Sequence, residues 1–423
     1  DDDTLKGLID VNIKKPVHQI SLSNKLQTTP SSGITRAYMF MVPVAFDAVR
    51  ICFNHLGGNG VASEVTALVS ASDEIGDLSY GNNSEGRKYA TPREGGLEVN
   101  TISPRGWHSV TWAGASSTGA ADAGASKITS VWSDMIECPS RGLLDDDGGR
   151  FTGYRPVIVR IFDGTGQFTR GSLGGFIDNL LNDCGPRVIQ GGYKFTDAVA
   201  TPSNWSNADG INQDNSAAPA IAIEFYTNDR ISKSFISVGD SRFAIASPSE
   251  AATKEYNATQ WLIEQKAIDG GDKYSAVPSS QSGLSTLSYS DRSLEILTQA
   301  DTKIDLGLYL AYSINSGIIT REVLDSAKYH LIRFVDQCTI YKITPVIVTS
   351  FPQGTGYTMP EKLLIDELEV FVAALKVRFL SPVIIYGDAS GGWLPGFNED
   401  ADHMTPAGYN DLAERIYQLM KTT

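Results

Sequence analysis

Positive charge, cysteine and long apolar runs are all scarce in this chain. Thirty-five lysines and arginines stand against 49 aspartates and glutamates, which gives a formal net charge of −14. Such an acidic protein repels phosphate backbones, so we expect no nucleic-acid partner. No apolar run approaches the roughly 18–20 residues that cross a bilayer, so we also expect no membrane span.

The four cysteines, Cys52, Cys138, Cys184 and Cys338, are widely separated along 423 residues. They contain no Cys-x-x-Cys pair, which excludes zinc-ribbon and thioredoxin-like sites, and they are too few for a disulfide scaffold. Cys52 and Cys338 lie in apolar runs and are interpreted as buried thiols. Whether any two cysteines form a bridge stays open. The acidic run Asp145–Asp147 is interpreted as a solvated loop rather than a calcium site, and we predict neither a metal nor a cofactor.

The first residues, Asp1-Asp2-Asp3-Thr4, include no initiator methionine and no signal-peptide apolar segment. We therefore expect the chain to be a processed or excised piece of a longer protein. A larger assembly formed through the missing N-terminal part stays open, and the sequence does not define the oligomeric state.

Residues 1–230 are predicted to form an all-β domain. Short β-branched and apolar runs dominate this half, and clusters of Gly, Asn, Asp and Ser separate them. Many short strands with such turns between them favour a sandwich of the jelly-roll type over a helical domain. The clearest runs are residues 37–44, 48–53, 64–69, 156–162 and 220–226.

Residues 231–423 are predicted to form a second domain, in which strands alternate with helices. Predicted strands lie at 235–238, 273–277, 304–311, 346–348 and 383–386, and predicted helices begin at 247, 321, 358 and 406. This alternation indicates a parallel sheet flanked by helices. We therefore expect a three-layer α/β/α domain with a flavodoxin-like sheet.

The first predicted strand of this domain leads directly into Gly239-Asp240-Ser241. A capping box at Ser247–Glu250, with Pro248 at the first helical position, then predicts a helix. A strand, a tight turn and a helix can expose a serine hydroxyl at the carboxyl edge of a sheet, where ligands bind in α/β folds. The tripeptide alone also fits an ordinary turn serine.

Among five histidines, only His403 has an aspartate, Asp400, three residues before it. It follows the last predicted strand, so it is expected at the same sheet edge as Ser241. A serine hydroxyl attacks an ester only if an imidazole accepts its proton, and a carboxylate orients that imidazole. We therefore expect activity to rise with pH as His403 loses its proton. Asp402 is the weaker candidate for the acid.

Two sequence blocks carry a family resemblance. Gly239-Asp240-Ser241, together with Asp400-x-x-His403 and the following Thr405-Pro406-x-Gly408-Tyr409, resembles the first and last blocks of the SGNH (GDSL-like) hydrolases. The resemblance covers about residues 232–423. It implies a carboxylic ester hydrolase with Ser241 as nucleophile, His403 as base and Asp400 as acid.

The resemblance also implies an oxyanion hole. Its three donors would be the Ser241 backbone N–H, a glycine after the second strand and an asparagine after the third. We assign these to Gly283, for which a plain turn is an equal interpretation, and to Asn315. Ser313 and Ser316 replace the Gly and Asp that usually flank this asparagine in the family.

The β-rich first half favours a carbohydrate substrate by analogy, because SGNH modules with such companions occur in carbohydrate-active proteins and in bacteriophage tail proteins that deacetylate polysaccharide. The expectation is a carbohydrate O-acetylesterase that is extracellular, cell-surface or virion-associated. Arg242, Trp393 and Phe397 are candidate substrate contacts; solvent exposure of Arg242 and packing of the two aromatics are the alternatives. A lipid ester or thioester substrate, or a polysaccharide-binding module with a degenerate scaffold, stays open.

Overall fold

The computed structural model contains two compact units, one made of Gln19–Asp229 and the other containing Arg230–Thr423. In the second unit it describes residues 231–244, 259–278, 285–289 and 304–422. Before them it describes residues 17–21, 25–30, 34–42, 44–56, 65–71, 78–82, 88–92, 107–117, 128–140, 155–163, 167–172, 188–194, 200, 218–219 and 221–227.

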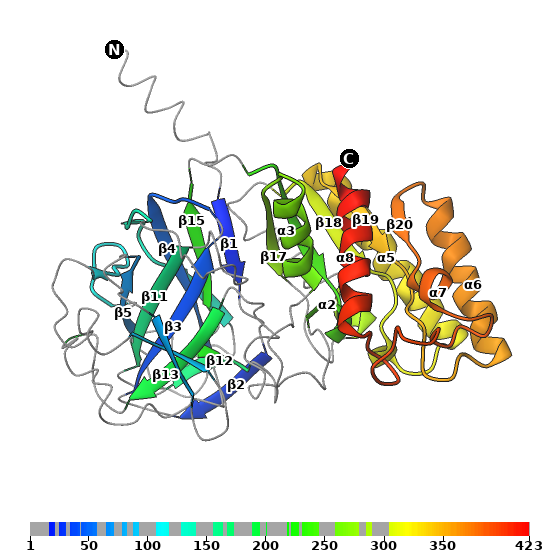
Figure 1. Cartoon of the computed structure of the whole chain (residues 1–423), viewed down its shortest axis with the longest axis horizontal. Helices are drawn as coiled ribbons and strands as arrows, with labels where there is room; N and C mark the ends of the chain where they lie inside the picture. The colour runs from blue at the N-terminus through cyan, green and yellow to red at the C-terminus, as the bar shows by residue number, and fades with distance from the viewer. Residues whose placement is uncertain are drawn as a thin grey trace, which may run out of the picture. The chain divides into compact units, whose positions relative to one another are not determined.

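The unit Gln19–Asp229 is built from β-strands (Figure 1). The five clearest apolar runs all form strands: β3 (Ile34–Val42), β4 (Ala48–Leu56), β5 (Val65–Ser70), β11 (Arg155–Asp163) and β15 (Ile221–Tyr226). Strand β11 pairs antiparallel with β3 and β5, and β15 pairs antiparallel with β4. The strand predictions are therefore confirmed, whereas the jelly-roll topology stays a prediction.

Shorter strands extend these two sheets and form two further sheets. The strand orders are β1-β15-β4-β10, with β9 also on β4, then β13-β3-β11-β5-β8, β14-β12-β2 and β6-β7. The added strands are β1 (Val17–Ser21), β2 (Lys25–Pro30), β6 (Leu78–Asn82), β7 (Lys88–Pro92), β8 (His108–Ser109), β9 (Ile128–Trp132), β10 (Ile136–Glu137), β12 (Gln167–Ser172), β13 (Val188–Lys194) and β14 (Ala218–Pro219).

A five-stranded parallel sheet forms the centre of the second unit, as predicted. Its order is β17-β16-β18-β19-β20, so β16, the first of these five strands along the chain, lies second in the sheet. This is the order of flavodoxin-like sheets, in which the reversal point lies beside the first strand. The strands are β16 (Lys233–Val238), β17 (Tyr274–Pro278), β18 (Leu306–Leu310), β19 (Thr344–Val348) and β20 (Arg378–Leu380).

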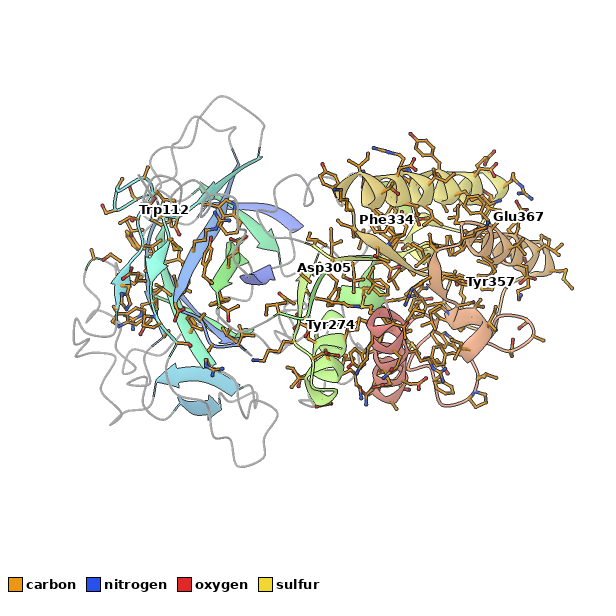
Figure 2. The ribbon with its side chains drawn as sticks, turned by 90° about the horizontal axis from the view of Figure 1, so that it is seen from above. Trp112, Tyr274, Asp305, Phe334, Tyr357 and Glu367 are labelled. Carbon is orange, nitrogen blue, oxygen red and sulfur yellow. The ribbon has the colours of Figure 1, made fainter. Side chains whose placement is uncertain are left out.

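Helices cover both faces of this sheet (Figure 2). Helices α3 and α8 pack together on one face, and α5 and α6 pack together on the other. Within the described residues, no helix combines the length and apolarity needed to cross a membrane. The helices are α2 (Ser241–Ala244), α3 (Thr259–Asp269), α5 (Arg321–Tyr341), α6 (Met359–Ala374), α7 (Pro382–Tyr386) and α8 (Pro406–Lys421).

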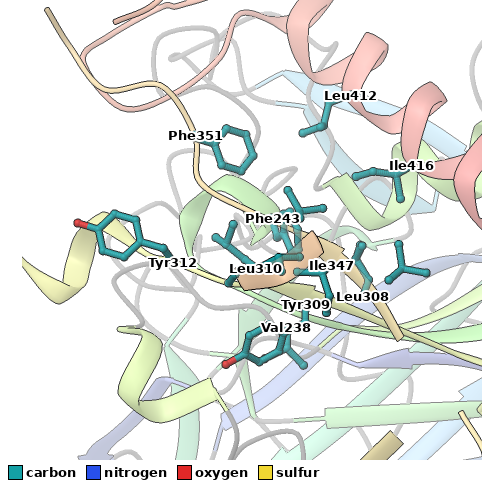
Figure 3. Close-up of a cluster of buried hydrophobic side chains, with 14 of the residues drawn as sticks. Val238, Phe243, Leu308, Tyr309, Leu310, Tyr312, Ile347, Phe351, Leu412 and Ile416 are labelled. Carbon is teal, nitrogen blue, oxygen red and sulfur yellow. The ribbon is translucent and has the colours of Figure 1, made fainter. Parts of the chain in front are cut away.

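The hydrophobic core lies between the sheet and its helices (Figure 3). All residues of β18 are buried, which explains why this strand reads as a continuous apolar run rather than an alternating one. Cys338 on α5 is also buried and free, and burial raises the pKa of its thiol to about 12, as expected for an inert core residue. Cys138 is buried too, and the side chain of Cys52 lies outside the described part.

The segment Val383–Tyr386, predicted as the fifth strand, is a helix, and the fifth strand is β20 instead. The local cause is Ser381-Pro382. The Ser381 hydroxyl accepts the Ile384 N–H at 3.4 Å, and Pro382 occupies the first helical position, where its fixed φ suits a helix. These start signals override the β-branched run.

The predicted start of α6 is confirmed by a capping box. The Glu361 carboxylate accepts the Thr358 N–H at 2.7 Å. The capping box at Ser247–Glu250 lies outside the described residues, and the described helix of that region is Thr259–Asp269.

Gly307, in the middle of β18, allows α5 to approach the sheet closely. A Cβ atom built on it would lie 2.8 Å from Phe334 Cζ and 3.0 Å from Cys338 Sγ. We expect Gly307→Ala to destabilise the protein by about 1–3 kcal/mol, because the helix must shift or the ring must leave its rotamer. Urea unfolding measures this change. Adding Phe334→Leu should recover part of the loss, and additive effects of the two substitutions would contradict the proposed contact.

Candidate active site

The nucleophile candidate Ser241 lies at the carboxyl edge of the parallel sheet. Strand β16 ends at Val238, and α2 begins at Ser241 itself rather than after it. Gly239 is required between them, because a Cβ there would lie 2.6 Å from Cδ2 of the buried Phe243 ring. The Asp240 carboxylate accepts the Arg242 N–H at 2.9 Å, which fixes the turn. Ser241 is 9% exposed, so the turn presents a serine that solvent reaches only partly.

The structure brings Ser241, His403 and Asp400 together. His403 Nε2 lies 3.0 Å from Ser241 Oγ. On the other side of the ring, Nδ1 lies 2.9 Å from Asp400 Oδ2 and 3.1 Å from Oδ1. A carboxylate beside Nδ1 favours the tautomer that carries its proton there, which leaves Nε2 free to accept the serine proton. This is the arrangement that nucleophilic catalysis by serine requires.

Asp400, rather than Asp402, contacts the imidazole. Asp400 Oδ1 also accepts the backbone N–H groups of Asp402 and His403, both at 2.7 Å. Burial alone would raise the pKa of Asp400, but these hydrogen bonds and His403 outweigh it, so the pKa of this carboxyl lies below its ordinary value. Asp400 therefore stays ionised through the weakly acidic range and can stabilise an imidazolium.

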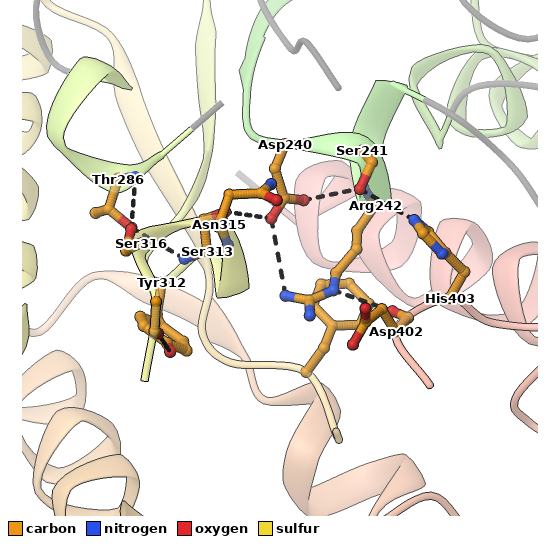
Figure 4. A network of polar contacts seen from close by, with 12 residues as sticks. Asp240, Ser241, Arg242, Thr286, Tyr312, Ser313, Asn315, Ser316, Asp402 and His403 are labelled. Atoms are coloured by element: carbon orange, nitrogen blue, oxygen red, sulfur yellow. Dashed lines mark hydrogen bonds and ion pairs between the residues drawn. The ribbon is translucent and has the colours of Figure 1, made fainter. Parts of the chain in front are cut away.

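Of the two other oxyanion candidates, Asn315 lies at the site and Gly283 lies outside the described residues. Asn315 is exposed and belongs to a single 3₁₀ turn, Ile314–Ser316, which follows the end of β18 at Leu310. The Ser313 hydroxyl accepts its N–H at 3.1 Å and thereby fixes the turn. Figure 4 shows Asn315 beside Asp240, on the same edge as Ser241.

If Asn315 donates to the oxyanion, Asn315→Ala should lower kcat for an activated acetate ester by about 10²–10³-fold, because one preorganised donor is lost from the developing charge. Steady-state kinetics on p-nitrophenyl acetate measure the effect. Asn410→Ala, at an exposed position of α8, is the matched control. A kcat loss no larger than that of the control would remove Asn315 from the oxyanion hole.

The three predicted substrate contacts differ in how far they are exposed. Arg242 is 2% exposed, and Trp393 is 8% exposed with its Nε1 donating to the Ala401 carbonyl at 3.0 Å. The alternative of solvent exposure for Arg242 is therefore wrong, and the packing interpretation of Trp393 agrees with its contact under the loop that carries His403, while substrate contact by either side chain stays a prediction. Phe397 is half-buried and packs on Tyr386 as a tilted pair, with the two ring centroids 5.1 Å apart. Its role stays a prediction.

A buried polar network behind the nucleophile was not predicted. Asp240 is fully buried, and its Oδ2 accepts the Ser313 hydroxyl at 2.6 Å. Thr286 continues the network, since its hydroxyl accepts the Ser313 N–H at 2.9 Å. Serine at position 313 is the one sequence signal that could have indicated this contact, because a glycine there has no hydroxyl to donate.

Metal ligands do not gather in the described part of the chain. No group of three or more His, Cys, Asp or Glu side chains lies close enough there to hold an ion. The acidic run Asp145–Asp147 lies outside the described residues.

Comparison of the sequence with protein-family models and with curated proteins finds no match. Among solved structures, the chain is similar to a GDSL-like lipase from Bacteroides thetaiotaomicron, with 14% identity, 45% of this chain and 89% of that chain covered, and a TM-score of 0.34. It is also similar to a psychrotrophic esterase from Pseudoalteromonas sp., with 13% identity and a TM-score of 0.35. This match covers 45% of this chain and 97% of that chain. A third similar structure is that of an acetyl xylan esterase, with 12% identity and a TM-score of 0.32. This match covers 44% of this chain and 98% of that chain.

Proposed function

We propose that the unit containing Arg230–Thr423 is a serine ester hydrolase of the SGNH type. The observation that supports this proposal is the pair of contacts at the His403 ring, 3.0 Å to Ser241 Oγ and 2.9 Å to Asp400 Oδ2. They join a nucleophile, a base and an acid in the geometry that acyl transfer needs.

In the proposed reaction, Ser241 Oγ attacks the ester carbonyl carbon while its proton moves to His403 Nε2. The oxyanion receives hydrogen bonds from the Ser241 N–H and the Asn315 amide. The tetrahedral intermediate collapses, and the alcohol leaves with the proton from Nε2. Water then attacks the acyl-enzyme, its proton passes through Nε2 to Ser241, and the carboxylic acid is released.

For the substrate, we propose O-acetyl or other short acyl groups on a carbohydrate or polysaccharide. The support is the β-rich companion unit, a prediction by analogy with carbohydrate-active proteins. The same proposal includes residues 1–230 as an accessory domain with a jelly-roll-like fold.

An acetate-release assay on a panel of acetylated glycans tests this proposal, with p-nitrophenyl palmitate as the long-chain comparison. We expect acetate release from at least one glycan and little turnover of palmitate. A preference for palmitate would contradict the carbohydrate substrate while leaving the hydrolase intact. No turnover of any ester would favour a binding module with a degenerate hydrolase scaffold.

A further inference from the structure

Arg242, the residue after the candidate nucleophile, is buried yet charged. Burial by itself would lower the pKa of Arg242, but the Asp240 carboxylate and other neighbours raise it above its ordinary value. The Arg242 Nη1 atom lies 3.8 Å from Asp240 Oδ2, and the guanidinium lies over the Phe351 ring at 5.2 Å from its centroid. A buried ion pair often adds little net stability, because removing both charges from water is costly. Stability alone therefore does not explain the Arg242–Asp240 pair.

The first important contact of Arg242 is with the loop that carries Asp400 and His403. Arg242 Nε donates a hydrogen bond to the Asp402 backbone carbonyl at 3.2 Å. The N–H of the same residue, Asp402, donates to Asp400 Oδ1 at 2.7 Å. Arg242, which follows Ser241 in the chain, is therefore hydrogen-bonded to the peptide segment between Asp400 and His403 (Figure 4).

The second contact reaches the oxyanion turn through Asp240. The carboxylate that pairs with Arg242 accepts the Ser313 hydroxyl at 2.6 Å, and that hydroxyl accepts the Asn315 N–H at 3.1 Å. Three catalytic segments that are distant in sequence are thus connected through one buried pair: the Ser241 turn, the Asp400–His403 loop and the Asn315 turn.

We propose that Arg242 is a positioning residue, which holds the Asp400–His403 loop at hydrogen-bond distance from Ser241 through the Asp402 carbonyl. The proposal rests on the proposed ester hydrolase. It depends on the planar guanidinium, because Nε and Nη1 engage Asp402 and Asp240 at the same time. A lysine at this position has one nitrogen, which cannot occupy both places.

The test is Arg242→Lys, which keeps the buried positive charge beside Asp240. We expect kcat for p-nitrophenyl acetate to fall by up to about 100-fold with little change in KM, because a small displacement of His403 from Ser241 disturbs only the chemical step. The control is Arg415→Lys, at the exposed Arg415–Asp411 pair on α8, which should leave kcat unchanged. Wild-type kcat in Arg242→Lys would overturn the proposal.

A second readout does not depend on hydrolysis. The imidazole NMR signals of the five histidines report their surroundings, and His403→Gln identifies the His403 signal. Arg242→Lys should shift that signal and leave the other four in place. An unmoved His403 signal would overturn the proposal even if the wild-type protein hydrolyses no ester, whereas inactivity of the wild type with a shifted signal would contradict only the proposed function.

If Arg242→Lys fails to fold, the double variant Asp240→Asn/Arg242→Met replaces it. This variant leaves no unpaired buried charge, and methionine fills the volume of the arginine stem without a donor for Asp402. It should reproduce the kcat loss and the His403 shift, and wild-type values for both would overturn the proposal.

Discussion

Ser241→Ala is expected to lower kcat for p-nitrophenyl acetate by about 10⁴–10⁶-fold, to the residual rate that binding and oxyanion donors provide. The reason is that Ser241 Oγ, 3.0 Å from His403 Nε2, is the nucleophile in the proposed reaction. Steady-state kinetics with the purified full chain measure the loss. Ser390→Ala, which removes an exposed hydroxyl bonded only locally to Asp388, is the control and should retain activity.

A covalent probe separates the loss of the nucleophile from a loss of folding. Diethyl p-nitrophenyl phosphate should attach one diethylphosphoryl group to Ser241 of the wild type, with release of p-nitrophenolate, and mass spectrometry of the digested protein locates it. Ser241→Ala should remain unlabelled while keeping its unfolding temperature. Unchanged turnover in this variant, or a label on another residue, would contradict the assigned nucleophile.

Asp400→Asn is expected to lower kcat by about 10⁴-fold, because a neutral amide neither holds the proton on His403 Nδ1 nor stabilises the imidazolium. Asp402→Asn should be much milder, since Asp402 serves the site through its backbone N–H and carbonyl, which the substitution keeps. The pair is therefore a matched comparison of two aspartates in one loop. A larger loss in Asp402→Asn than in Asp400→Asn would show that the acid was assigned to the wrong residue.

The parts of the site that depend on short-range signals could be predicted from the sequence. The strand before Gly239 and the three-residue offset between Asp400 and His403 are both local patterns, and the parallel-sheet rule then places them at one edge. The same holds for α5 and for the start of α6, where apolar spacing and a capping box are visible in a few residues. The strand predicted at Val383–Tyr386 is wrong because its apolar residues fit either element, and the start signal Ser381-Pro382 decides for the helix.

The contacts of Arg242 and Asp240 could not be predicted in this way. Asp240 and Ser313 are 73 residues apart, and Arg242 and Asp402 are 160 apart. Nothing in a sequence window around either residue indicates such a partner, so the sequence predicts for Arg242 only a substrate contact or exposure to solvent. The sequence likewise does not show the partner of Trp393, because this partner is the backbone carbonyl of Ala401, which carries no side-chain signal.

The Asp400–His403 pair is assembled almost entirely within its own loop. Asp400 accepts the N–H of His403, and Glu399 donates its N–H to the His403 carbonyl at 3.0 Å. The contact to Ser241, in contrast, spans 162 residues. Acid and base are therefore joined by hydrogen bonds within a few residues, and Arg242 and Trp393 contact this loop from outside, at the Asp402 and Ala401 carbonyls. A design that grafts such a loop onto another sheet edge would bring acid and base together as a unit, but it must also supply the outside contacts to the Ala401 and Asp402 carbonyls and the 3.0 Å approach to a serine.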